Sequence, residues 1–431
     1  MQISKYPDNQ QLALLLQRPA IDQEDLSATV SQILRSVKTS GDEALRGFTA
    51  RFDGVQLDRL EVNAEELATA ESLLPNDLKA AIRLAAKNIE TFHAAQREAV
   101  RQIETMPGVV CWRKSVGIER VGLYVPGGTA PLFSTVLMLG IPAQLAGCQE
   151  VVLCTPPAKD GSVHPAILFA AQVAGVHRIF KVGGAQAIGA LAYGTETIPQ
   201  VYKIFGPGNR YVTAAKLLVQ QSGTPIDMPA GPSEVLVFAD ETCVPAFVAA
   251  DLLSQAEHDV DSQVVFLTTS ETVLQQVIDE VEKQVVTLPR QKMLRTALNH
   301  SVFLLLENQQ VALEAINFYA PEHLILACEN AEAFAEKVFN AGSVFLGNYT
   351  PEAAGDYASG TNHTLPTSGF ARSYSGVSLD SFMKKITFQR ISREGMAGIG
   401  PAIVTMARAE ELEAHARAVA IRLDRMAHGL D

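Results

Sequence analysis

The sequence has few basic residues for its length. Its 431 residues include 35 Lys and Arg against 47 Asp and Glu, so the formal net charge is −12. It also has no run of basic residues. A general nucleic-acid binder needs basic clusters that displace the counterions around the phosphates. This balance therefore excludes that class of protein, and no nucleic-acid partner is expected.

Cysteine is scarce as well. The five cysteines are Cys111, Cys148, Cys154, Cys243 and Cys328, an odd number, and no two of them have the CxxC spacing of a zinc knuckle or redox centre. We expect free thiols in a reducing compartment, and therefore a cytoplasmic protein. Nothing in the sequence near Cys111 or Cys148 indicates a lowered thiol pKa, so no catalytic role is assigned to them.

Long uninterrupted apolar runs are missing. Pro7 and Asp8 stand where a secretory signal would need a continuous apolar segment. Residues 121–149 carry no charge and are long enough to span a bilayer, but several Gly and Pro residues interrupt them. A buried strand, a glycine turn and a buried helix explain this stretch better. The sequence thus predicts a soluble protein with no membrane partner.

The pattern of apolar residues predicts an α/β fold. The length suggests two or three domains, and the first quarter has helical spacing over 25–48 and 64–98, with Asn63 as a cap. Strands and helices then alternate in two successive arrays, which implies two doubly wound domains. The expected strands of the first array are 150–154, 178–182, 201–206 and 233–240; those of the second are 263–268, 301–306, 323–328 and 343–347.

The end of the chain differs from these arrays. Residues 350–378 are rich in Gly, Ser, Thr and Pro and form a segment too long for an idle loop in a compact enzyme. A strand over 384–391 and a long helix over 401–428 are expected to follow.

Two glycine-rich loops follow predicted strands. The segments 183–189 (GGAQAIG) and 206–210 (GPGNR) each end a strand and open a helix, where backbone N–H groups can meet a phosphate. Neither has the GxGxxG pattern with a downstream acidic residue, and a plain tight turn explains either loop alone equally well. Their expected position at neighbouring strand ends favours a nucleotide site.

A group of polar residues near 255 has ligand chemistry. In the predicted helix DLLSQAEHD (251–259), Gln255 and His258 lie on one face at spacing i, i+3, among several carboxylates. Such donors can hold a divalent metal, although a solvated helix end is the more common explanation of this pattern.

Other candidates lie further along the chain. Glu322 and His323 precede a buried strand, and a carboxylate beside an imidazole suits two different proton transfers near neutral pH. An exposed dipeptide in a loop is the equal alternative. Asp356 and His363 lie in a loop whose composition suits ligand binding. The favoured explanation of Glu410 and His415 is an ordinary amphipathic helix.

Several longer motifs resemble those of the L-histidinol dehydrogenase family. The segment IDMPAGPSEVLVFADETCVPAFVAADLLSQAEH (226–258) carries the resemblance most specifically. It extends over nearly the whole chain through YVPGG (124–128), VGGAQAIGALAYGT (182–195), FGPGNRYV (205–212), YAPEHL (319–324), AGSVFLG (341–347) and GDYASGTNHTLPTSGFAR (355–372).

The resemblance implies a division of the chain and a set of roles. It implies an N-terminal arm (1–24), a discontinuous Rossmann-like domain on the zinc and substrate side (25–125 and 239–379), a second Rossmann-like domain on the NAD side (126–238), and a swapped C-terminal tail (380–431).

The resemblance also implies one zinc ion per subunit, held by Gln255, His258, Asp356 and His415. Glu322 and His323 match proton acceptors; substrate contacts match Ser233, His363, Glu410, His323 and the zinc ligands; NAD contacts match Tyr124, Gln186 and Asn209.

The implied reaction is the oxidation of L-histidinol to L-histidine through the aldehyde, with two NAD consumed. His323 would act as base in both oxidations, and Glu322 would activate the water that attacks the aldehyde. Zinc would hold the imidazole and amine of the substrate as a template. Because the family's tail crosses to a second subunit, the resemblance also implies a domain-swapped homodimer.

Two other functions compete with this one. A relative of the same fold that oxidises another small alcohol, such as a sulfonated diol, would keep Glu322 and His323 but lose the groups directed at the imidazole. His363, Glu410 and Ser233 are present, which favours histidinol. A catalytically silent binding protein on the same scaffold would have lost Glu322 or His323, and both are present.

Overall fold

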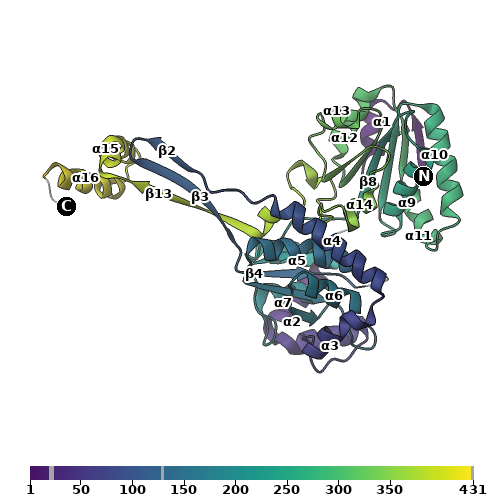
Figure 1. Cartoon of the computed structure of the whole chain (residues 1–431), viewed down its shortest axis with the longest axis horizontal. Coiled ribbons are helices and arrows are strands. Elements are labelled where there is room, and N and C mark those ends of the chain that lie inside the picture. The colour runs from purple at the N-terminus through teal and green to yellow at the C-terminus, as the bar shows by residue number, and fades with distance from the viewer. Residues whose placement is uncertain (19–23, 128–130, 429–431) are drawn as a thin grey trace. The chain divides into compact units, whose positions relative to one another are not determined.

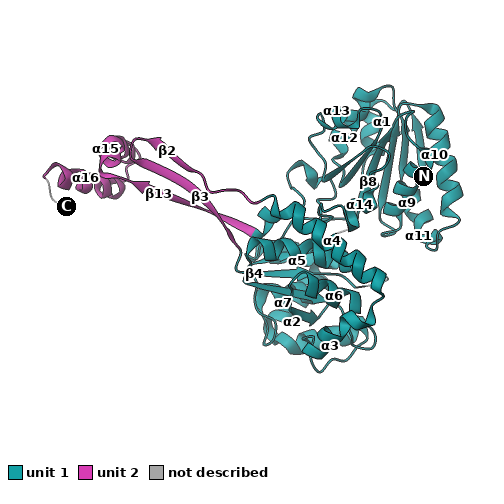
Figure 2. Cartoon of the chain, viewed as in Figure 1, with its two compact units in different colours: residues 1–96, 118–382 teal, residues 97–117, 383–431 magenta. Residues whose placement is uncertain are grey.

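The computed structural model describes residues 1–18, 24–127 and 131–428. Its internal contacts separate two units (Figure 2). Unit 1 comprises residues 1–96 and 118–382, and unit 2 comprises residues 97–117 and 383–431. The end of the expected glycine turn, from Gly128, lies outside the described residues, as does the end of the expected N-terminal arm.

Unit 1 contains a six-stranded parallel sheet (Figure 1). Its order is β1 (Gln2–Lys5), β10 (Val302–Leu305), β9 (Gln263–Thr268), β8 (Glu234–Ala239), β11 (His323–Ala327) and β12 (Ser343–Leu346). In β8 successive side chains point to opposite faces, so Val235 and Val237 join one apolar core and Leu236 and Phe238 join the other. Burial on both faces explains why these strands are continuous apolar runs.

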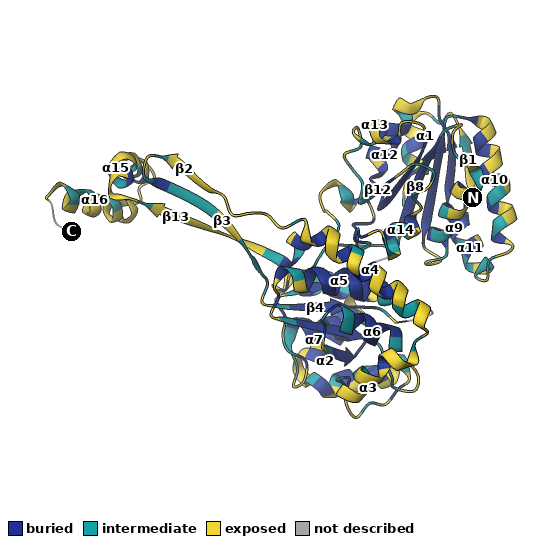
Figure 3. Cartoon of the chain, in the orientation of Figure 1, coloured by how far each residue is buried: buried dark blue, intermediate teal, exposed yellow. Residues whose placement is uncertain are grey.

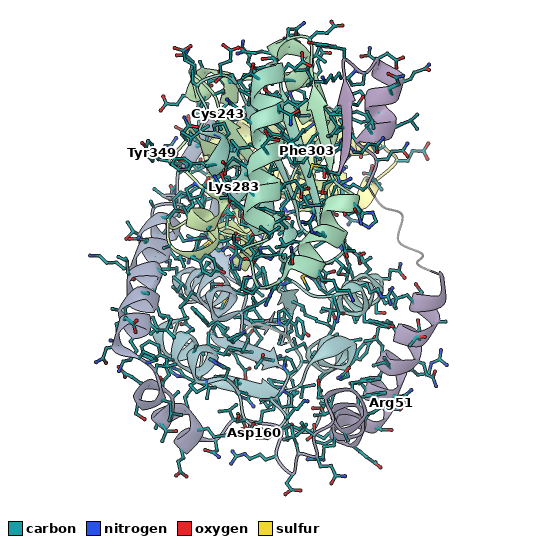
Figure 4. All side chains as sticks on the ribbon, turned by 90° about the vertical axis from the view of Figure 1, so that its right-hand side faces the viewer. Arg51, Asp160, Cys243, Lys283, Phe303 and Tyr349 are labelled. Atoms are coloured by element: carbon teal, nitrogen blue, oxygen red, sulfur yellow. The ribbon has the colours of Figure 1, made fainter. Side chains whose placement is uncertain are left out.

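Helices cover both faces of this sheet. The core on one face includes α9 (Pro245–Ala256), α10 (Glu271–Val285) and α11 (Gln291–Asn299). Phe303 of β10, labelled in Figure 4, is fully buried in this core. The core on the other face includes α1 (Asn9–Leu15), α12 (Gln309–Tyr319) and α13 (Ala331–Ala335). A short helix, α14 (Glu352–Tyr357), contacts α9.

Unit 1 also contains a four-stranded parallel sheet. Its order is β6 (Arg178–Lys181), β5 (Glu150–Thr155), β4 (Arg120–Tyr124) and β7 (Lys203–Phe205). One core joins it to α2 (Glu24–Phe48), α7 (Gly184–Tyr193) and α8 (Arg210–Gln221). Three further helices contact one another: α4 (Asn76–Ala94), α5 (Phe133–Ala146) and α6 (Pro165–Val173). Two short helical turns lie along the chain: η1 (Thr49–Asp53) follows α2, and η2 (Ala70–Leu73) follows α3 (Ala64–Thr69).

Unit 2 is built from an antiparallel sheet and two helices. The strand order is β13 (Met383–Ile391), β3 (Val109–Gly117) and β2 (Gln102–Met106), and the helices are α15 (Arg393–Ala409) and α16 (Glu413–Ala427). Trp112 of β3 stacks on Phe388 of β13 with ring centroids 5.4 Å apart. Most of β13 is exposed (Figure 3).

The structure confirms the α/β class with parallel sheets, and it refines the expected elements. The predicted helix over 25–48 is α2. The one expected over 64–98 is divided between α3, η2 and α4, with Asn63 capping α3 as predicted and Pro75 directly preceding α4. The helix expected over 401–428 is also divided, because Glu411 adopts a φ of 59° between α15 and α16.

One strand was placed in the wrong array. The sequence grouped residues 233–240 with the first array, but β8 pairs with β9 and β11 in the middle of the six-stranded sheet. The contacts of α2 with α7 and α8, and of α4 with α5, also group these helices with the four-stranded sheet, not with the segment 239–379. The domain limits themselves stay a prediction.

Residues 121–149 supply a buried strand, β4, and a buried helix, α5, as predicted. In the part of the chain that the structure describes, no helix combines the length and apolar character of a membrane span. All five cysteines are described and free. Burial raises the pKa of Cys148 to about 11, so this thiol stays protonated near neutral pH.

Candidate active site

The two proton acceptors expected from the sequence lie together in the interior. Glu322 directly precedes β11 and His323 is its first residue; both are buried. The chain reaches them from α12 through Ala320, which adopts a φ of 53°. Gly342 passes so close that a Cβ atom there would lie 2.5 Å from the Glu322 carbonyl oxygen. The exposed loop that was the alternative for this dipeptide is thereby excluded.

The backbone of Glu234, the first residue of β8, contacts the side chains of both Glu322 and His323. The backbone N–H of Glu234 donates a hydrogen bond to Glu322 Oε2 at 2.9 Å. The carbonyl oxygen of Glu234 lies 3.3 Å from His323 Nδ1. Because that oxygen only accepts, the neutral His323 ring carries its N–H on Nδ1 and its free lone pair on Nε2. His323 Nε2 is buried and has no hydrogen-bond partner.

Carboxylates surround this imidazole. The distances are 3.6 Å from Nδ1 to Glu322 Oε2, 3.9 Å from Nδ1 to Glu352 Oε1, and 3.6 Å from Nε2 to Asp356 Oδ1. Burial alone would lower the pKa of His323, but Glu352, Glu322 and Asp356 together raise it to about 10. Burial raises the pKa of Glu322 to about 8, although His323 and the Glu234 N–H oppose that shift. A nearby cation would lower both values.

Glu352 is a site residue that the sequence analysis missed. It opens α14 and is buried, and its Oε2 has no hydrogen-bond partner. Burial raises its pKa well above the usual range of a glutamate. A single Glu after a proline looks like a solvated helix start in the sequence. Its only signal was its position in the unusually long segment 350–378.

Two of the expected metal ligands, His258 and Asp356, lie close together here, and a third, Gln255, lies in α9. Gln255 ends the buried face of α9, and both atoms of its amide are buried without a partner. His258 lies just beyond α9, not within it as expected, because the helix ends at Ala256. Its Nε2 lies 3.9 Å from Asp356 Oδ2.

These residues fit a divalent metal ion. His258, Glu352 and Asp356 offer ligand atoms within 4.8 Å of one another. Buried polar atoms nearly always have partners, and a cation would supply one for Gln255 Oε1. Burial alone would raise the pKa of Asp356, but His323 holds it below the usual range, so the carboxylate is ionised and ready to ligate. Imidazole with oxygen donors suits a borderline ion such as zinc.

His363 joins this cluster from the loop after α14. Its Nδ1 lies 2.9 Å from the carbonyl oxygen of Asp356, and its Nε2 lies 3.0 Å from the Thr135 hydroxyl. Burial lowers its pKa, which favours the neutral ring. Ser233 directly precedes β8 and is partly buried. Its carbonyl oxygen accepts a hydrogen bond from the Gln263 N–H at 3.3 Å.

The expected cofactor contacts lie at the carboxyl ends of the four-stranded sheet. Tyr124 ends β4, Gln186 lies in the first turn of α7, and Asn209 caps α8. The chain passes from β4 outward through β5 to β6 and then returns to β7 beside β4, so the topological switch point lies between β4 and β7. Ligands of open α/β sheets bind at such a point.

The two glycine loops are not at neighbouring strands as expected, because β6 and β7 form opposite edges of this sheet. Tyr124 connects them instead. Its hydroxyl accepts a hydrogen bond from Gly184 N–H at 3.0 Å, and burial raises its pKa to about 12, so it stays protonated. At Gly206 a Cβ atom would lie 2.0 Å from the Tyr124 carbonyl oxygen. Only glycine allows this approach.

Partners within the chain already occupy part of the second glycine loop. The N–H of Gly206 donates to Asp227 Oδ2 and its carbonyl accepts from Lys216 Nζ, each at 2.8 Å, and these two buried side chains form an ion pair. The Asn209 side chain accepts from the N–H groups of Tyr211 and Val212. These N–H groups are therefore satisfied without the phosphate that the sequence suggested for this loop.

Comparison with known proteins places this site in a family. The family model of histidinol dehydrogenase matches residues 16–423. A histidinol dehydrogenase of Bacteroides thetaiotaomicron is 60% identical over 98% of this chain and 99% of its own length. The chain belongs to the histidinol dehydrogenase family. The resemblance found in the sequence is thus confirmed, and the protein is an oxidoreductase of histidine biosynthesis.

Other histidinol dehydrogenases agree with this placement. The relative from Xylella fastidiosa is 55% identical over 91% of this chain and 92% of its own length. The crystal structure of histidinol dehydrogenase from Elizabethkingia anophelis superposes with a TM-score of 0.97 at 54% identity, and covers 99% of this chain and 98% of that one. An acetylating aldehyde dehydrogenase from Geobacillus thermoglucosidasius shares the fold at a TM-score of 0.50 and 14% identity, with 88% and 93% covered.

Two residues expected in the histidinol dehydrogenase site belong to unit 2. Glu410 directly follows α15, and His415 lies in the first turn of α16; both are exposed. They do not share one continuous helix as expected, since the chain turns at Glu411 between them. The other expected zinc and substrate residues all belong to unit 1.

Proposed function

We propose that this protein oxidises L-histidinol to L-histidine through L-histidinaldehyde, with NAD as the hydride acceptor in both oxidations. Its place in the histidinol dehydrogenase family supports the substrate. The observation that carries the chemistry is the buried pair Glu322 and His323, held by one residue, Glu234, beside the cluster of unpartnered ligand atoms.

His323 acts as the base in the first oxidation. Its Nδ1 is directed at the Glu234 carbonyl, so Nε2 is free to take the proton of the substrate hydroxyl while the hydride leaves the carbon. The same nitrogen takes a proton from the hydrated aldehyde in the second oxidation. Its proton must be released between the two steps, since one imidazole cannot accept both.

Glu322 activates the water that hydrates the aldehyde. Oε2 is bound to the Glu234 N–H, which fixes the carboxylate and leaves Oε1 for a water molecule. Glu322 must be ionised for this task. Burial, which raises its pKa to about 8, also makes the ionised carboxylate a stronger base than an exposed one. Burial of the site protects the reactive aldehyde between the two steps.

Gln255, His258 and Asp356 would hold one zinc ion per subunit, with His415 of a second subunit as a further ligand. When bound, the ion supplies a positively charged template that orients the imidazole and amine of the substrate. Glu352 lies close enough to contribute a carboxylate to this cluster.

The substrate is proposed to contact Ser233, His363 and Glu410, together with His323 and the zinc ligands. His363, kept neutral by burial, suits contact with a polar group on the substrate.

NAD is proposed to bind at the switch point of the four-stranded sheet, in contact with Tyr124, Gln186 and Asn209. The placement of all three at the carboxyl ends of the strands supports this assignment. Gln186 is nearly fully buried in α7, so its amide offers a fixed donor and acceptor.

The functional form is proposed to be a homodimer that exchanges the tails formed by residues 380–431. The exposed positions of Glu410 and His415 in unit 2, and the apolar side chains that unit 2 leaves exposed, support this proposal. The exposed apolar residues of unit 2 include Ile103, Ile386, Phe388, Met406, Leu412 and Ile421.

Product analysis tests the proposal. Purified protein is incubated with L-histidinol and excess NAD, and the products are separated by chromatography. We expect L-histidine to accumulate together with NADH. Accumulation of the aldehyde alone, or no turnover of histidinol while small diols are oxidised, would contradict the proposal.

A further inference from the structure

A partly buried ion pair, Arg18 with Glu234, lies next to the proposed catalytic pair. Glu234 is 2% exposed, and its carboxylate receives two hydrogen bonds from Arg18, from Nε at 2.6 Å and from Nη2 at 2.7 Å. This two-point geometry fixes the direction of the carboxylate as well as its charge. Glu234 is the same residue whose backbone N–H and carbonyl hold Glu322 and His323.

Arg18 also binds the segment that leads into the catalytic pair. Its Nη2 donates to the Tyr319 carbonyl oxygen at 2.7 Å, and its guanidinium lies 4.0 Å from the centroid of the Tyr319 ring. Tyr319 ends α12, four positions before His323. Arg18 therefore ties the start of β8 to the chain segment that enters β11.

The Tyr319 hydroxyl also contacts Glu234 and its neighbour on β9, Gln263. It lies 3.3 Å from Glu234 Oε2 and donates to Gln263 Oε1 at 2.9 Å. The amide of Gln263 in turn donates to the Gln17 carbonyl oxygen at 3.3 Å. The segment after α1 is thus held on the sheet by partners that also hold Glu234.

From these contacts we infer that Arg18 is a positioning residue for the reaction: through Glu234 and Tyr319 it fixes the backbone that orients Glu322 and His323. This inference rests on the proposed function of that pair. A carboxylate buried without its cation must move or take up a proton. If the carboxylate moves, the peptide groups of Glu234 at the start of β8 shift relative to β11. Proton transfer is sensitive to such shifts, since misplacement by about 1 Å can cost about 100-fold in rate.

The test compares Arg18→Ala and Arg18→Lys with a matched control, Arg372→Ala. Arg372 lines the same surface cavity as Arg18, which has a volume of about 220 Å³, but Arg372 is exposed and donates to the Phe318 carbonyl oxygen instead of to Glu234. Each variant is assayed as the full chain loaded with zinc, with histidinol and with histidinaldehyde as substrates. Metal content and the KM for NAD are measured alongside.

We expect Arg18→Ala to lower kcat at least about 10-fold for both substrates, with the KM for NAD and the metal content unchanged. Arg18→Lys should recover only part of the rate, because it restores the charge but not the two-point contact. Arg372→Ala should stay within about 2-fold of the wild type. A purely structural role would instead reduce the amount of folded, metal-loaded protein and leave the kcat of that fraction intact.

Two results would overturn the inference. The first is a folded Arg18→Ala protein whose kcat is within about 2-fold of the wild type. The second is a loss of kcat matched by an equal loss in the Arg372→Ala control. If Arg18→Ala does not fold, Tyr319→Phe replaces it, since it removes only the hydroxyl contacts to Glu234 and Gln263. A lower kcat with unchanged KM for NAD supports the inference, and an unchanged kcat contradicts it.

A parallel assay of His323→Asn separates this inference from the proposed function. If His323→Asn keeps wild-type turnover, the proposed catalytic pair is wrong, and the inference about Arg18 is then wrong as well. If His323→Asn is inactive while folded Arg18→Ala keeps its kcat, the result supports the catalytic pair and contradicts only the role of Arg18.

Discussion

Asp356 Oδ1 lies 3.6 Å from His323 Nε2, the nitrogen that we propose as the catalytic base. The other oxygen of the same carboxylate lies 3.9 Å from His258 Nε2. One side chain thus links the proton-transfer residue to the proposed metal ligands. This arrangement explains how a bound cation would offset the negative charge that otherwise holds the pKa of His323 near 10.

The proposed roles of Glu322 as the water-activating group and of His323 as the base predict an unequal effect of Glu322→Gln on the two steps. The amide keeps the size of the side chain but cannot accept a proton from water, so hydration of the aldehyde should slow by about 100-fold or more. The alcohol step, which needs only His323, should be much less affected. Single-turnover assays started separately with histidinol and histidinaldehyde measure the two steps. Equal losses in both would show that this division of roles is wrong.

The buried position of Glu322 predicts how the aldehyde step depends on pH. Burial raises the pKa of Glu322 to about 8, so its base form is populated above that pH and lost as pH falls through it. A bound cation lowers the pKa, which places the rise in rate at or below pH 8. Rates with histidinaldehyde are measured from pH 5.5 to 9.5, a range of about four units around neutrality. A rate independent of pH in the wild type, or the same rise in Glu322→Gln, would contradict this assignment.

The unpartnered amide of Gln255 predicts a loss of metal binding in Gln255→Ala. Removing an oxygen ligand should weaken zinc binding by about 100-fold or more, since even outer contacts cost 10–100-fold. Gln275→Ala is the matched control, because Gln275 is exposed on α10 and bonds to Asp279. Competition with a chelator, followed by metal analysis, gives the affinities without reference to turnover. Zinc bound equally tightly by both variants would remove Gln255 from the ligand set.

The proposed exchange of tails predicts complementation between two inactive variants. Gln255→Ala disables the part of a site that unit 1 provides, and His415→Ala the part that unit 2 provides. If sites are completed across subunits, a mixed dimer contains one intact site, and random reassembly of an equal mixture restores about a quarter of the wild-type activity. The mixture is dissociated, reassembled and assayed. No activity above that of the separate variants would mean that each subunit completes its own site.

Local patterns in the sequence predicted individual elements better than the packing between them. Glu322 and His323 stood out because a polar pair preceded a continuous apolar strand, and that strand is β11 of a buried parallel sheet. Asn63 was recognised as a cap from its local pattern, because a helix N-terminus depends on neighbouring residues alone. Local patterns of this kind are readable without knowledge of the fold.

Features that depend on strand order were not predictable. The place of β8 between β9 and β11 depends on which strands pair, and the apolar run 233–240 fits either array equally well. Glu352 and Arg18 were missed for the same reason, since their partners His323 and Glu234 are distant in the chain and a charged residue alone resembles a solvated one. The break at Glu411 was hidden because apolar spacing continues through it.

The most direct test of the account is the number of NADH molecules formed for each L-histidinol consumed, measured with excess NAD before and after the metal is removed by a chelator. The account predicts about two NADH per histidinol, loss of this turnover on metal removal, and its return when zinc is added. One NADH per histidinol with release of the aldehyde, or full turnover after metal removal, would contradict it.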